Sequence, residues 1–168
     1  MDNVKVTKDV ENKTLTIERA FDAPKEKVWR AYADKEWFEK WWGPEGWETT
    51  TKVFDFKPGG QIHYCMKCVD PKQTDWFGQE SWGLMQIESV EENVGFTAMD
   101  HFSDATGEPN ASMPRQKFVV KLVEQDGKTN LVSSSVLETV EQMEELVKMG
   151  MIEGFSSQLN RLEELVKE

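Results

Sequence analysis

The chain has few cysteines and no long apolar run. Its two cysteines, Cys65 and Cys68, are too few to form a disulfide framework. No apolar run reaches the roughly 18 residues that a transmembrane helix needs, and none of signal-peptide length is found near the N-terminus. We therefore expect a cytoplasmic protein with no membrane span.

Positive charge is also scarce. The chain has 20 lysine and arginine residues against 31 aspartate and glutamate residues, which gives a formal net charge of -11. Binding to a nucleic-acid backbone depends on clustered cations that release counterions from the phosphates. This charge balance therefore argues against nucleic acid as a partner.

The composition is that of a folded protein. Of the 168 residues, 38% are hydrophobic and 11% are aromatic, which supplies the apolar surface that offsets the entropy of ordering. A length of roughly 100–200 residues is typical of one domain. We expect a single domain over residues 1–168, with a flexible N-terminal segment at 1–12.

Aromatic residues and helix signals gather near the N-terminus. Five of the seven tryptophans lie between Trp29 and Trp47. Pro24 suits the first turn of a helix, and a second short helix is predicted at 35–42. Glycine and proline at 43–46 end that second helix.

Most of the remaining chain predicts short strands. Alternating apolar and polar residues, or runs rich in β-branched and aromatic residues, mark each one. The joints between them carry turn residues, including the Asp126-Gly127 pair. Neighbouring strands are therefore expected to be antiparallel, at 14–21, 47–56, 61–69, 79–90, 95–102, 115–124 and 128–137.

The C-terminal segment predicts one long amphipathic helix over residues 140–166. Thr139 and Gln142 have the spacing of a capping box, and apolar residues then recur at intervals of three and four. Gly150 and Gly154 interrupt the pattern, each at a cost of roughly 1 kcal/mol relative to alanine. We expect a strand backbone or a ligand to come close to these glycines.

Several local features occur together in a fixed order, and they are similar to features of one known family. They are Arg19-Ala-Phe-Asp-Ala-Pro24 followed by Val28-Trp29, Trp41-Trp42-Gly43-Pro44, Asp55-Phe-Lys-Pro-Gly-Gly60, Gly83 inside a strand, Phe102-Ser-Asp104 with Gly107, and Gly154-Phe155. The chain resembles the family named for the C-terminal domain of the activator of the ninety-kilodalton heat-shock chaperone's ATPase. The family usually has tryptophan where this chain has Phe155.

This resemblance implies an α+β helix-grip fold, as in START-like and birch-pollen-allergen-like proteins. In that fold a curved antiparallel sheet wraps around a long C-terminal helix, with two short helices after the first strand and a cavity between sheet and helix. Relatives include ligand carriers, chaperone-binding modules and polyketide cyclases. The resemblance therefore implies a fold but no shared chemistry.

Side-chain direction and the resemblance together select the residues expected to line the cavity. Alternate residues of a strand share one face, and methionine suits an adaptable lining. Ordinary core packing would use the same residue types, so this alternative stays open for each. The predicted lining consists of Trp42, Ile62, Tyr64, Met66, Trp82, Phe118, Met143, Met151 and Phe155.

The signals for metal binding and catalysis are weak. Cys65 and Cys68 have the spacing of a zinc or redox motif, but residues three apart in a strand point to opposite faces. His63, His101, Asp100 and Glu80 can act as acids or bases, yet none has a visible nucleophile partner or oxyanion-hole motif. We assign no metal, no cofactor and no catalytic residue.

The leading hypothesis is binding of a small apolar or aromatic molecule without chemistry on it. One alternative is a chaperone-binding module that uses exposed sheet and loop surface. Another is a cyclase or lyase in which Tyr64 or His101 moves protons. A homodimer formed through sheet edges or helix faces also stays open.

Overall fold

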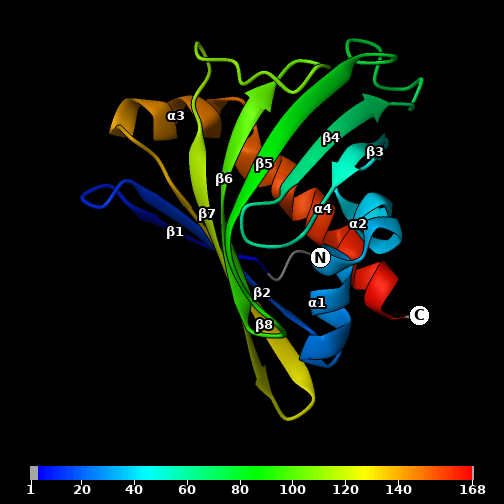
Figure 1. Ribbon diagram of the computed structural model, residues 1–168, viewed down its shortest axis with the longest axis vertical. Helices are drawn as coiled ribbons and strands as arrows, with labels where there is room; N and C mark the ends of the chain where they lie inside the picture. Colours follow the sequence, from blue (N-terminus) through cyan, green and yellow to red (C-terminus); the bar gives the residue numbers. More distant parts are fainter. Residues whose placement is uncertain (1–3, 168) are drawn as a thin grey trace.

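The computed structural model describes residues 4–167 and contains one eight-stranded sheet and four helices (Figure 1). Every neighbouring pair of strands is antiparallel, and the sheet order is β1-β2-β8-β7-β6-β5-β4-β3. The α+β helix-grip prediction is confirmed. The strands are β1 (Lys5–Asp9), β2 (Thr14–Phe21), β3 (Trp47–Phe54), β4 (Gln61–Cys68), β5 (Glu80–Glu91), β6 (Gly95–Ser103), β7 (Gln116–Gln125) and β8 (Lys128–Val136).

All seven predicted strands are present, with ends that differ by at most two residues from the prediction. Strand β1 was not predicted, and it lies within the segment 1–12 that was expected to be flexible. Most of its residues are exposed, so it carries no alternation of buried apolar residues. It forms by pairing along the edge of β2. Residues 1–3 of that segment lie outside the described residues.

Two short helices, α1 (Lys25–Ala33) and α2 (Lys35–Trp41), connect β2 to β3, as predicted. The Asp34 side chain caps α2 by accepting a hydrogen bond from the backbone N–H of Glu36 at 3.0 Å. Both helices contact the C-terminal helix α4 (Met151–Val166). They lie beside the C-terminal part of α4, at the end of that helix away from α3 (Figure 1).

The prediction of one continuous C-terminal helix is wrong. The structure has two helices, α3 (Val140–Lys148) and α4, because Gly150 adopts a left-handed conformation with φ of 89°. Glycine enters that region without the steric penalty of a Cβ atom. Thr139 caps α3 as predicted, by accepting from the N–H of Gln142 at 3.0 Å, whereas the Gln142 side chain reaches the N–H of Glu138.

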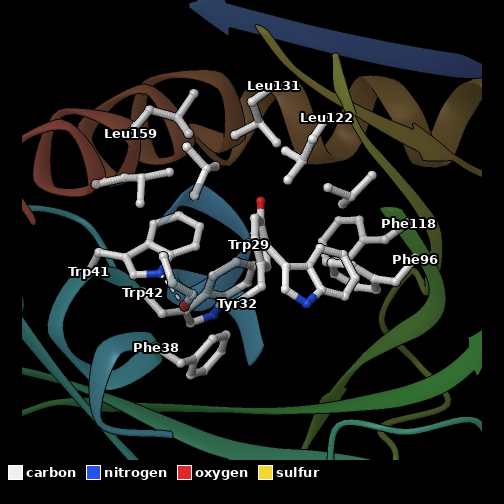
Figure 2. Close-up of a cluster of buried hydrophobic side chains, with 14 of the residues drawn as sticks. Trp29, Tyr32, Phe38, Trp41, Trp42, Phe96, Phe118, Leu122, Leu131 and Leu159 are labelled. Atoms are coloured by element: carbon white, nitrogen blue, oxygen red, sulfur yellow. Dashed lines mark hydrogen bonds between the residues drawn. The ribbon is translucent and has the colours of Figure 1, made fainter. Parts of the chain in front are cut away.

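The main hydrophobic core lies between the sheet and helices α1, α2 and α4 (Figure 2). Trp41 and Phe38 are completely buried there, and the Trp41 indole N–H donates to the Ala31 carbonyl at 2.8 Å. A smaller cluster of Leu15, Leu137, Met143 and Leu146 packs under α3. None of the helices among residues 4–167 has the length and apolar character needed to cross a membrane.

Candidate functional site

A pocket of about 270 Å³ lies between the sheet and the C-terminal helices. Its walls come from β2, β4, β6, β7, β8, the C-terminal helices with their junction, and the segment after α2. The apolar and glycine part of the lining is Ile17, Trp42, Pro44, Met66, Phe102, Phe118, Leu146, Met149, Gly150, Met151, Gly154 and Phe155. The polar part is Tyr64, Asp100, Gln116, Ser133, Ser135 and Gln158.

Six of the nine residues predicted to line a cavity meet in this pocket. They are Trp42, Tyr64, Met66, Phe118, Met151 and Phe155. Trp42 is central among them, since its ring centroid lies 5.8 Å from that of Tyr64 and 6.4 Å from those of Phe118 and Phe155. The strand alternation and the helix stripe therefore direct these side chains to one place.

The structure does not bring Ile62, Met143 and Trp82 to the pocket. Ile62 is buried in the main core, and Met143 packs in the smaller cluster under α3. Trp82 pairs with Cys65, so both point away from the face that carries Tyr64. Its ring lies 5.1 Å from the His63 ring on that other face. The prediction for Trp82 assigned the wrong face of β5.

Gly83 explains how the Tyr64 ring reaches the pocket. Tyr64 on β4 pairs with Gly83 on β5, and a Cβ atom at Gly83 would lie 2.2 Å from Tyr64 Cζ. Because glycine leaves this space empty, the Tyr64 ring lies across β5 and reaches Asp100 on β6. The Tyr64 hydroxyl donates a hydrogen bond to Asp100 Oδ1 at 2.9 Å.

Asp100 is the centre of a buried polar group. It pairs with Gln116 on β7, and its carboxylate is hydrogen-bonded by the side chains of Tyr64 and Gln116. Burial raises the pKa of Asp100 to about 7, although both hydrogen bonds oppose the change. Burial, followed by the charge of Asp100, raises the pKa of Tyr64 well above its usual value. This carboxyl group therefore changes protonation near neutral pH.

Most of the polar lining of the pocket was not predicted from the sequence. Asp100 was considered only as an acid or base, and the polar residues Gln116, Ser133, Ser135 and Gln158 were not selected. The alternation contained a usable signal, because Ser133 and Ser135 share a strand face with Leu131, and Gln116 shares one with Phe118. Only the strand register brings these faces together around Asp100.

Arg161 of α4 shapes the pocket wall next to Trp42. Its guanidinium group donates to the carbonyl oxygen of Gly43 at 2.7 Å and to that of Trp47 at 3.0 Å. It also donates to the carbonyl of Lys40 at 3.0 Å. These contacts fix the segment between α2 and β3, which places Trp42 and Pro44 in the lining.

The other candidate groups lie outside this pocket. The His63 ring packs against Trp82, and its Nε2 is 3.0 Å from the Asp104 carbonyl oxygen. His101 Nε2 is 2.9 Å from Gln86 Oε1. Cys65 and Cys68 are both free thiols. Among residues 4–167, no group of three or more His, Cys, Asp or Glu side chains is placed to hold a metal ion.

Comparisons with known proteins agree with the fold. Residues 22–167 match the family model described as activator of Hsp90 ATPase homolog 1-like protein. A crystal structure of a Mycobacterium smegmatis protein is similar with a TM-score of 0.86 and 33% identity, over 97% of this chain and 96% of that chain. A solution structure of an Arthrobacter aurescens protein gives a TM-score of 0.87 and 29% identity, over 97% and 91% of the two chains. No curated protein matches the chain significantly.

Proposed function

The chain belongs to the family of activator of Hsp90 ATPase homolog 1-like proteins, and from that premise we propose that it binds a small apolar or aromatic molecule in the pocket. The observation that carries this proposal is the composition of the walls. Trp42, Phe118 and Phe155 present aromatic surface, and a few polar groups gather around Asp100. Small-molecule sites typically combine apolar walls with a few placed polar groups that orient the ligand.

The pocket volume limits the size of the ligand. At about 270 Å³ it lies just below the range of roughly 300–1,000 Å³ that is usual for ligand sites. A ligand with one or two rings fits this space better than a sterol or a long fatty acid. Met149 is exposed and belongs to the lining, which supports entry beside the junction of α3 and α4.

An amide-resolved NMR titration with a panel of one- and two-ring aromatic molecules tests this proposal. We expect saturable shifts at Tyr64, Met66 and Phe155 for at least one member. Met66→Trp, which fills the pocket with a larger side chain, should weaken that binding about tenfold or more. Met99→Trp is the matched control, because Met99 pairs with Lys117 on the opposite face of the sheet.

Two results would contradict ligand binding in this pocket. One is binding that Met66→Trp leaves unchanged, and the other is the absence of saturable shifts across the panel. The second result would favour the chaperone-binding alternative. That alternative is supported by the family description and by the exposed aromatic pair Trp76 and Phe77 between β4 and β5. Stimulation of a purified Hsp90 ATPase by the chain, lost in a Trp76→Ser, Phe77→Ser variant, would establish it.

A further inference from the structure

The polar end of the pocket contains the acidic residue Asp100, and no basic side chain is among the described residues that line the pocket. Asp100 is buried and accepts hydrogen bonds from Tyr64 and Gln116. None of the described lining residues is lysine, arginine or histidine. A bound carboxylate would therefore meet the Asp100 carboxylate in a buried site with no cation to compensate, which is strongly unfavourable.

Two buried amide atoms in the lining have no partner among the described residues. Gln116 Oε1 is an acceptor without a donor, while the other end of that amide serves Asp100. Gln158 Nε2 is a donor without an acceptor, and its Oε1 accepts from the Gly43 N–H at 2.9 Å. Leaving such atoms unpaired costs about 1–3 kcal/mol each. Both residues line the pocket, so a ligand can supply the missing partners.

The polar groups of the pocket lie on two opposite walls, the sheet and helix α4. The acceptors Asp100 and Gln116 lie side by side on β6 and β7, whereas Gln158 lies on α4, the helical wall of the pocket. The aromatic residues Trp42 and Phe118 form part of the same lining. Aromatic faces attract cations through their quadrupoles, and more strongly when the cation is shielded from water.

We propose that the pocket binds a small organic cation, a protonated aromatic amine, whose N–H groups donate to the Asp100 carboxylate and to Gln116 Oε1. Its aromatic body packs against Trp42, Phe118 and Phe155, and an acceptor atom on that body meets Gln158 Nε2. This inference rests on the proposed ligand-binding function and specifies the class of ligand.

The electrostatics of the chain support this assignment. An ammonium group beside Asp100 would favour the ionised carboxylate and offset the burial that raises its pKa to about 7. Binding at neutral pH would therefore release a proton from Asp100. The formal net charge of -11 also attracts cations to the molecule and repels anions.

Matched probes that differ only in the head group test the inference. One such triad is 2-phenylethylamine, 2-phenylethanol and phenylacetic acid, with corresponding indole and naphthalene triads to vary the body. Binding is measured by amide-resolved NMR at about pH 8, where Asp100 is largely ionised and the amines are protonated. We expect the amines to shift the resonances of pocket residues with affinities at least about tenfold above those of the alcohols, and the acids not to bind.

Asp100→Asn keeps the shape of the side chain and removes its charge. In this variant the preference for amine over alcohol should fall to about threefold or less, with binding of the alcohol retained. Glu92→Gln, at an exposed position in the β5–β6 turn, is the matched control and should leave the preference unchanged.

Proton release can be measured on the unmodified chain. Titration calorimetry near pH 7, in buffers of different ionisation enthalpy, should show that binding of the amine releases a fraction of a proton per site.

The outcomes separate this inference from the function on which it rests. Equal binding of alcohols or acids at pocket residues would overturn the amine assignment and leave the ligand-binding function standing. Amine binding without proton release, or with its preference intact in Asp100→Asn, would also overturn the assignment. The absence of shifts at pocket residues for every probe would overturn both.

Discussion

Asp100 contributes a pH dependence to the free energy of unfolding of the chain. Burial raises the pKa of this carboxyl group from 3.8 to about 7 in the folded state. Between these values the folded state binds more protons than the unfolded state, so the free energy of unfolding falls as the pH rises. Ionised Asp100 is therefore destabilising above neutral pH, and the loss is present in full once the pH exceeds the folded pKa.

We predict that Asp100→Asn removes this dependence. The stability of the variant relative to the original chain should rise by about 2–3 kcal/mol between about pH 5 and pH 8. Urea unfolding at a series of pH values measures the difference. Glu92→Gln should show a flat difference, and an equally flat profile for Asp100→Asn would show that Asp100 does not titrate in this window.

For single residues, the strand pattern predicted which face a side chain lies on better in β4 than in β5. Ile62, Tyr64 and Met66 were placed correctly on the inward face of β4, although only Tyr64 and Met66 line the pocket. Trp82 was not placed correctly, because its strand contains Gly83 and small polar residues that leave the inward face ambiguous. Pairing of Trp82 with Cys65 decides its direction, and that pairing is a property of the sheet.

At the scale of elements, Arg161 connects α4 to the segment between α2 and β3. It donates to backbone carbonyls, including those of Gly43 and Trp47, which no other described side chain serves. A guanidinium group suits this position because its donors fan out in one plane, whereas an ammonium group is a single point charge. Gln158 of the same helix accepts from the Gly43 N–H, so Arg161 and Gln158 together hold this segment against α4.

We predict that Arg161→Met destabilises the chain by about 2 kcal/mol, because the carbonyl groups lose charged donors. Urea unfolding measures the loss, and NMR should show shifts at Trp42 and Pro44. Arg161→Lys should recover only part of the stability. Arg115→Met is the control: Arg115 pairs with Glu138 at 3.2 Å on the surface, where such pairs contribute little. Equal losses in the two methionine variants would contradict this role.

Of the two boundaries in the C-terminal helical segment, the start of α3 was predictable from the sequence and the break at Gly150 was not. The start of α3 at Thr139 follows from a local capping pattern, which the sequence displays directly. The break at Gly150 was not predicted, because apolar residues recur at helical spacing on both sides of it. A glycine within a helix differs little in pattern from a glycine between two helices. The left-handed conformation at Gly150 ends α3 before α4 begins, and Met149, Gly150 and Met151 at this junction line the pocket.

For the whole molecule, we propose that residues 1–168 form a single cooperative domain. The two hydrophobic clusters share strand β2, since Leu15 belongs to the smaller cluster while Ile17 and Phe21 belong to the larger one. Loss of one cluster therefore removes support from the other. This arrangement favours unfolding of both clusters in one step.

Scanning calorimetry should show one transition with a calorimetric to van't Hoff enthalpy ratio of about 1. Met143→Ala, in the smaller cluster, should cost about 2–5 kcal/mol and shift that single transition to lower temperature. Leu159→Ala, in the main hydrophobic core, is the matched comparison. A second, separate transition in Met143→Ala would show that α3 and its cluster unfold on their own.

The sequence by itself indicated seven of the eight strands, helices α1 and α2 and the start of α3, because alternation, turn residues and helix caps act over a few neighbouring residues. The fold class followed from the resemblance to a known family. The sequence also selected Trp42, Tyr64, Met66, Phe118, Met151 and Phe155 as lining residues. The tertiary structure alone decided the polar end of the pocket. Asp100, Gln116 and Gln158 lie on different elements, and strand register and the crossing of α4 bring them together. The distances between these three side chains depend on pairing between residues far apart in the sequence, and a pattern of neighbouring residues does not encode that pairing.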